Sequence, residues 1–164
     1  MATSMFSGVP NEFPIMRRDL WSITFPPEMN ISERFEVEAE RPKFNNSVKE
    51  VKYKNMECKY KGALKFEDMK IDFRDVVGPS VSQKIWAWQR QHNDPLTGCG
   101  AYPSIYKKNL TLLMEDECGN AVQKWILYGC ILKSVDGGNL DMNSDADPVI
   151  MSIGVAYDYA ALEA

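Results

Sequence analysis

The sequence predicts a mainly β protein, built as two packed antiparallel sheets or a barrel-like sandwich, with one α-helix and one long basic hairpin or loop. Several short segments alternate apolar and polar side chains, a period typical of strands with one buried face. A single segment has apolar side chains at helical spacing, and another concentrates basic residues among few large apolar ones. The 164 residues and the 45% hydrophobic fraction fit one domain with a buried core, spanning residues 1–164.

Strand signals fall on both sides of the expected helix. The clearest lies within 64–77, where Met69, Ile71 and Phe73 alternate with charged residues, so one face should be buried. The others lie in 13–25, where one or two strands are expected, and in 35–39, 106–115, 122–135 and 150–159. The last three predict a meander that follows the helix. Residues 1–12 are expected to form a flexible N-terminal arm and residues 160–164 a C-terminal tail.

The single expected helix lies at about 80–92. Val81, Ile85 and Trp88 fall on one of its faces, at i, i+4 and i+7. Trp88 is therefore expected to anchor the helix on a sheet. Trp86 lies on a different face, and packing at an interface or under a loop is favoured over a ligand platform.

Residues 41–61 form a basic segment that is expected to protrude as the hairpin or loop. The basic residues in this segment, or directly after it, are Arg41, Lys43, Lys49, Lys52, Lys54, Lys59, Lys61 and Lys65. A protein contact or a solvated surface is favoured over nucleic-acid binding, because only Phe44, Tyr53 and Tyr60 are interleaved as stacking groups. We expect an assembly interface here. Its candidate residues are Arg41, Lys43, Lys49, Lys52 and Lys54.

No sequence motif for catalysis, cofactor binding or metal binding is evident, so no such residue is expected. The one histidine, His92, lies at the end of the expected helix, where a polar residue is favoured by the helix dipole. Cys58, Cys99, Cys118 and Cys130 have long, uneven gaps and form no C-x-x-C pair, which favours free thiols in a reducing compartment.

An acidic run at 141–147 has the spacing of a calcium loop but not its chemistry. Ala146 stands where the loop needs glycine for a sharp turn, and Ser152 stands where it needs a bidentate glutamate. A solvated loop is therefore favoured over a calcium site.

Overall charge and hydropathy narrow the functional classes. The net charge of −4 argues against a dedicated nucleic-acid binder, although DNA could pass beside such a protein without sticking. No signal peptide is evident at the N-terminus, and no apolar stretch approaches the roughly 18 residues of a membrane span. A soluble protein that pairs its strand edges with neighbours is expected.

The order of these segments resembles the tail tube protein of contractile-tailed, myovirus-type bacteriophages. The similarity covers residues 62–159, with 13–39 similar in pattern only. The motifs that carry it are Lys65–Ile71, Gln83–Gln89, Tyr106–Lys108, Gly137–Met142 and Ala156–Tyr159. The basic segment and the residues after Tyr159 depart from the family.

This resemblance implies a structural virion protein and no enzyme. Six subunits would form a ring whose inner strands join into one β-barrel, and stacked rings would form the tail tube, assembled in the host cytoplasm. The implied partners are further copies, the sheath, the baseplate and the tail terminator, with DNA passing through the lumen. Asp72, on the wet face of its strand, is a candidate lumen-facing residue.

Three alternatives remain open. The same fold could serve in a phage-derived contractile injection particle or bacteriocin, or as a tube initiator in a baseplate. A monomeric β-barrel hydrolase or binding module is the alternative from a different class.

Overall fold

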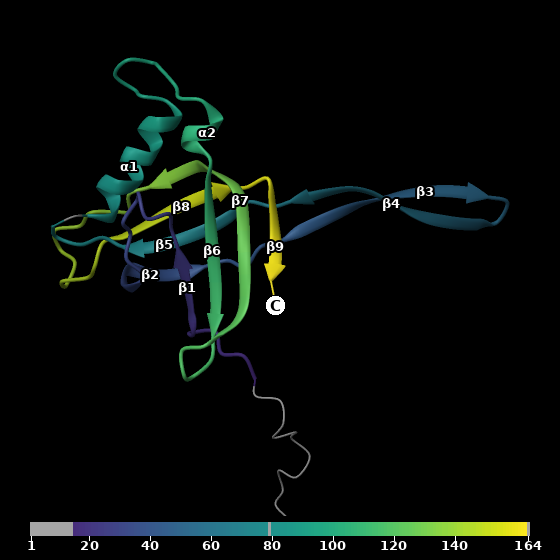
Figure 1. The fold of residues 1–164 in the computed structure, drawn as a ribbon, viewed down its shortest axis with the longest axis horizontal. Coiled ribbons are helices and arrows are strands. Elements are labelled where there is room, and N and C mark those ends of the chain that lie inside the picture. Colours follow the sequence, from purple (N-terminus) through teal and green to yellow (C-terminus); the bar gives the residue numbers. More distant parts are fainter. Residues whose placement is uncertain (1–14, 79, 164) are drawn as a thin grey trace, which may run out of the picture.

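The computed structural model describes residues 15–78 and 80–163 and confirms a mainly β fold with one main helix. Figure 1 shows a β-rich body from which one long hairpin projects. The described strands are β1 (Trp21–Thr24), β2 (Glu36–Ala39), β3 (Phe44–Tyr53), β4 (Met56–Phe66), β5 (Met69–Arg74), β6 (Lys108–Glu115), β7 (Ala121–Asp136), β8 (Ile150–Ala156) and β9 (Tyr159–Glu163). The helical elements are α1 (Val81–His92), the short α2 (Pro103–Tyr106) and a 3-10 turn (Glu33–Phe35).

Seven of these strands form one antiparallel sheet in the order β1-β6-β7-β8-β5-β2, with β9 also paired to β7. The other two, β3 and β4, pair only with each other among the described strands. The large sheet folds over at β7, so that side chains from both of its halves meet in one core, but it does not close into a barrel. The barrel-like sandwich is therefore open along one side.

The long strand β7 belongs to both halves of the sheet. Its first part pairs with β6 and β9, and its last part pairs with β8. Between these parts the register to β6 shifts, and Gly129 adopts a left-handed backbone with φ of 65°. Such a bulge bends a strand and increases its twist. The Gly129 N–H donates to Asn109 Oδ1 at 3.2 Å, which ties the bend to β6.

A second break lies directly opposite this bend. The expected strand at 150–159 is interrupted at Tyr157 and Asp158, and the chain continues as β9. The carboxylate of Asp158 lies 2.8 Å from the Lys107 Nζ and packs against the Cα of Gly129. Residues 160–163, expected to form a tail, are therefore part of the sheet.

The helix α1 covers the core as its apolar spacing predicted. Val81, Ile85 and Trp88 are all buried, and the Trp88 indole N–H donates to the Tyr106 carbonyl at 2.8 Å. Its first turn is capped by Ser80, whose hydroxyl accepts from the backbone N–H of Gln83.

The sequence prediction differs from the structure at the N-terminus and before β6. The arm expected at 1–12 lies outside the described residues, and within 15–25 only the four residues of β1 form a strand. The short helix α2 was not expected. Pro103 starts it, a position where the missing N–H of proline costs nothing.

Replacing Gly129 by alanine is expected to lower the free energy of unfolding by about 2–3 kcal/mol, measured by urea denaturation. Left-handed backbone strain costs about 1–2 kcal/mol, and the new methyl group would overlap the Asp158 carboxylate. Gly98→Ala is the matched control, because Gly98 also has a positive φ, of 70°, but an added methyl group there would meet no atom within 4 Å. Equal losses in both variants would show that the close approach of Asp158 is no constraint.

Candidate functional site

The β3–β4 hairpin confirms the hairpin alternative for the basic segment and is amphipathic. Residues that pair across the two strands share a face. One face, called here the apolar face, carries Phe44, Val51, Tyr53, Met56, Cys58, Tyr60, Leu64 and Phe66, together with the polar Asn46 and Lys49. The opposite face carries the pairs Lys52–Glu57, Glu50–Lys59, Val48–Lys61 and Asn45–Lys65.

A bulge in β3 produces this separation. The register shifts between Asn46 and Val48, so Phe44 joins the face of Val51 although the two are an odd number of residues apart. The Ser47 hydroxyl accepts from the Ala63 N–H at 2.8 Å and lies against the Cα of Gly62, where a side chain would overlap it. Glycine at position 62 therefore permits the bulge.

Away from its base, the apolar face is exposed in the described part of the chain. Tyr53 is 68% exposed, Met56 72% and Tyr60 60%. Soluble monomers rarely expose a contiguous apolar surface of this kind, and such surfaces mark interaction sites. The sequence analysis predicts an interface in this segment from its basic residues and not from an apolar face. Alternation of Met56, Cys58 and Tyr60 with charged residues was the available signal.

The base of the hairpin is fixed to the body by aromatic contacts. The Phe66 ring lies 6.4 Å from that of Phe44 and 5.8 Å from that of Tyr157, measured between centroids. The Tyr157 hydroxyl also accepts from the Lys43 N–H at 3.3 Å. The hairpin is therefore positioned at its base while its outer part projects (Figure 1).

The five basic interface candidates divide into two groups. Arg41 and Lys43 lie at the base and contact the body: Arg41 donates to Gln123 Oε1 at 3.0 Å, and Lys43 lies 3.1 Å from the Glu40 carboxylate. The hydrogen bond from Lys43 lowers the pKa of Glu40. Lys49, Lys52 and Lys54 lie on the projecting part and are exposed. Only these three are placed to reach a distant partner.

A groove of about 900 Å³ opens along the unclosed side of the sheet, between β1 and β2. Here the two edge strands are joined through a side chain. The backbone N–H of Ile23 on β1 donates to the Glu36 carboxylate on β2, 3.0 Å from each oxygen. Burial raises the pKa of Glu36 to about 8, opposed by the Ile23 N–H and assisted by nearby Glu33. No sequence pattern had marked Glu36 as a special residue.

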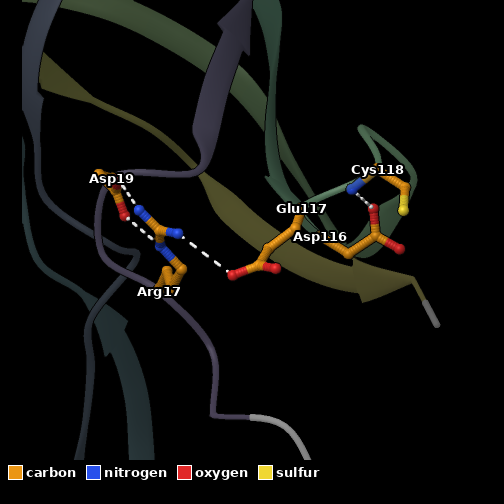
Figure 2. A network of polar contacts seen from close by, with 5 residues as sticks. All are labelled: Arg17, Asp19, Asp116, Glu117 and Cys118. Atoms are coloured by element: carbon orange, nitrogen blue, oxygen red, sulfur yellow. Dashed lines mark hydrogen bonds and ion pairs between the residues drawn. The ribbon is translucent and has the colours of Figure 1, made fainter.

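Figure 2 shows an exposed polar network at the rim of this groove. Arg17 donates to both oxygens of Asp19, at 3.0 and 2.7 Å, and to Glu117 at 3.2 Å. The bond from Arg17 lowers the pKa of Asp19. In the turn between β6 and β7, Asp116 accepts the backbone N–H groups of Cys118 and Asn120 at 2.8 Å, and the bond from Asn120 lowers its pKa. Exposed pairs of this kind add little to the stability of the fold. The network links the chain before β1 to the turn between β6 and β7.

Asp72 lies on β5, on the face opposite the core residues Ile71 and Phe73. Its carboxylate is largely covered, with 14% of the side chain exposed, and lies 3.4 Å from the Lys70 Nζ. Asp72 therefore lies on the side of β5 away from the core, but most of its carboxylate is shielded from solvent and lies beside the Lys70 ammonium group.

The two residues considered for catalysis or ligand binding, His92 and Trp86, lie in different environments. His92 joins α1 to β7: its Nδ1 lies 2.9 Å from the Trp88 carbonyl, and its Nε2 accepts from the Leu132 N–H at 3.1 Å. Trp86 is 52% exposed on the outer face of α1. Over residues 15–78 and 80–163, no group of three or more His, Cys, Asp or Glu side chains is placed to hold a metal ion. No helix in these ranges is long and apolar enough to cross a membrane.

The raised pKa of Glu36 predicts that stability falls as the pH rises from about 4.5 to about 8. Below pH 4.5 Glu36 is protonated in both the folded and the unfolded chain. Between about pH 4.5 and 8 the unfolded chain releases this proton while the folded chain keeps it, and above pH 8 the loss of stability is complete. Because this carboxyl is partly open to solvent, we expect a loss on the order of 2 kcal/mol. Urea denaturation at a series of pH values measures this dependence. Glu36→Gln should remove most of the change in unfolding free energy with pH, whereas Glu38→Gln, on the exposed side of β2, should not. A slope unchanged in Glu36→Gln would contradict the assignment.

Comparison with known proteins gives matches in structure but not in sequence. No protein-family model matches the chain, and no curated protein matches it. The sheath/tube terminator of the extracellular contractile injection system PVC, in its extended state, has a TM-score of 0.74 at 13% identity, over 94% of this chain and 99% of that one. The tube-terminating cap of the anti-feeding prophage gives 0.73 at 13% identity, over 99% of both chains. A chain of the PVC sheath–tube complex gives 0.65 at 13% identity, over 94% of both. The chain therefore has the fold of the tube and tube-terminator proteins of contractile tails and injection systems.

Proposed function

We propose that this chain is a structural, non-enzymatic subunit of the inner tube of a contractile phage tail. Six copies form a ring, stacked rings form the tube, and DNA leaves through its lumen. The sheath, the baseplate and a tail terminator are the other partners. The subunit is assembled in the host cytoplasm and resides in the virion.

The unpartnered apolar face of the hairpin is the observation that carries this proposal. Burying one large apolar side chain contributes about 1.5–3 kcal/mol, and several such side chains stand exposed on this face. Each copy therefore presents a surface that another protein must cover. Arg41, Lys43, Lys49, Lys52 and Lys54 border it and are proposed to contribute to the same interface.

The charge balance supports passage of DNA through the assembly. A wall with few available cations would avoid pairing with phosphates. We propose that the face of β5 carrying Asp72 faces the lumen, where the ion pair with Lys70 reduces the attraction of that lysine for phosphate.

A second candidate is a tube or terminator subunit of a contractile injection particle. It is favoured by the comparisons, because the terminator structures match with TM-scores of 0.74 and 0.73 and the tube chain with 0.65. A tube subunit must bind copies on both sides of its ring, whereas a terminator ring ends the stack. Electron microscopy therefore separates them: stacked hollow rods indicate a tube subunit, and single rings a terminator.

The purified protein is expected to form hollow rods with six-fold rings at high concentration or on baseplate nuclei. Replacing Val51, Tyr53, Met56 and Tyr60 by serine should abolish the rods while leaving a folded monomer by circular dichroism, because β3 and β4 pair only with each other. Loss of even 2 kcal/mol at each contact weakens association about 30-fold.

The matched control changes four residues of the opposite face, Glu50, Glu57, Lys59 and Lys65, to serine. This variant keeps the net charge and the apolar face, and should still form rods. A wild-type protein that stays monomeric even with baseplate nuclei would sink the proposed function. Rods formed equally well by the apolar-face variant would remove the hairpin from the assembly.

A further inference from the structure

The two ends of the molecule differ in charge but share exposed apolar side chains. Along the longest axis in Figure 1, the hairpin tip marks one end and the loop between β7 and β8 lies at the other. Between Phe44 and Phe66 the hairpin has six lysines and two glutamates, a charge of +4 in a chain whose total is −4. This basic end carries the apolar face.

The opposite end, residues 136–149, is acidic and also exposes apolar groups. It contains Asp136, Asp141, Asp145 and Asp147 and no lysine or arginine. Leu140 is 86% exposed and Met142 104%. Val77, 106% exposed, belongs to the β5–α1 connection, which is held to this loop by a hydrogen bond from the Asp75 N–H to the Val149 carbonyl at 3.0 Å.

These two ends match each other in both properties. Lys49 pairs with Tyr60 on the apolar face, and the Nζ of Lys54 lies 5.5 Å from the centroid of the Tyr53 ring. These two lysines would meet the aspartates around exposed Leu140 and Met142, and such complementarity favours one orientation over others. The hairpin of a copy projects away from its own acidic loop, so it cannot cover that loop itself (Figure 1). Only another copy can bring the two surfaces together.

We propose that the apolar face of the hairpin of one copy docks on the 136–149 loop of the next copy, with Lys49 and Lys54 facing the aspartates. The inference rests on the self-assembly proposed above and identifies the surface that receives the hairpin. The contact joins two different surfaces, and repeated contacts of this kind generate a ring or a continuing stack.

Charge reversal on each side tests the contact. A hairpin variant carries Lys49→Glu and Lys54→Glu, and a loop variant carries Asp141→Lys, Asp145→Lys and Asp147→Lys. Each alone should reduce the sedimented, assembled fraction about tenfold or more, because like charges now face each other. The variant with all five changes should recover assembly. A control with Glu38→Lys, Glu117→Lys and Glu163→Lys alters net charge as the loop variant does, and no hairpin reversal should rescue any loss it shows.

A cross-linking measurement decides the matter if a reversed variant fails to fold. Cys58 lies on the apolar face, and Ser144 lies in the acidic loop. With Cys99 and Cys118 replaced by serine, a short bismaleimide should link copies carrying Ser144→Cys into ladders, and adding Cys58→Ser should abolish them.

The outcomes separate this inference from the proposed function. Three results would overturn the contact alone, provided that the wild type forms rods. They are a loop variant that assembles as well as the wild type, a combined hairpin and loop variant that does not recover assembly, and ladders that survive Cys58→Ser. Absence of any rod or ring from the wild type would overturn the proposed function as well.

Discussion

The bend of β7 at Gly129 is the constraint on which the rest of the architecture depends. It turns a single sheet back over its own core, and the neighbouring break at Asp158 lets β8 and β9 follow the turn. The Lys107–Asp158 ion pair and the Asn109 side chain hold this corner. Because the sheet folds without closing, β1 and β2 are left as edges on its open side. The groove at Glu36 is a direct consequence of that incomplete closure.

The core and the proposed assembly surface lie in different parts of the chain. The core draws on α1 and both halves of the large sheet, whereas the outer hairpin contributes no buried side chain. The outer hairpin can therefore project without being needed for the stability of the body. The same hairpin has lysines along its length, and charged residues on an exposed two-stranded element discourage indiscriminate pairing. The lysines therefore restrict which proteins can pair with the hairpin that carries the exposed apolar face.

Local pattern predicted the elements whose environment is set by their own residues. The helix at Val81–His92 followed from three apolar positions, and β5 from the alternation at 69–73. On β4, alternation with charged residues marks Met56, Cys58 and Tyr60 as one face of the hairpin, but the place of Phe44 on that face has no such signal, because a one-residue bulge near Ser47 moves Phe44 to it. Glu36 was missed because its burial arises from the apposition of β1, a contact between segments that carry no mutual signal in sequence. The extent of β9 depends on pairing with β7 in the same way.

The open edge of the body and the hairpin limit unwanted strand pairing in different ways. An open edge invites any strand to add to it, and at the groove this is opposed by Glu36, whose carboxyl occupies the free N–H of Ile23. Burial raises the pKa of Glu36 to about 8, so near neutral pH its carboxyl fills that position without introducing a charge into the groove. The hairpin differs, because each of its strands pairs on one side only and keeps an outer row of unpaired N–H and C=O groups. Its choice of partner in the proposed assembly therefore depends on the side chains of its two faces, since backbone pairing alone accepts any extended chain.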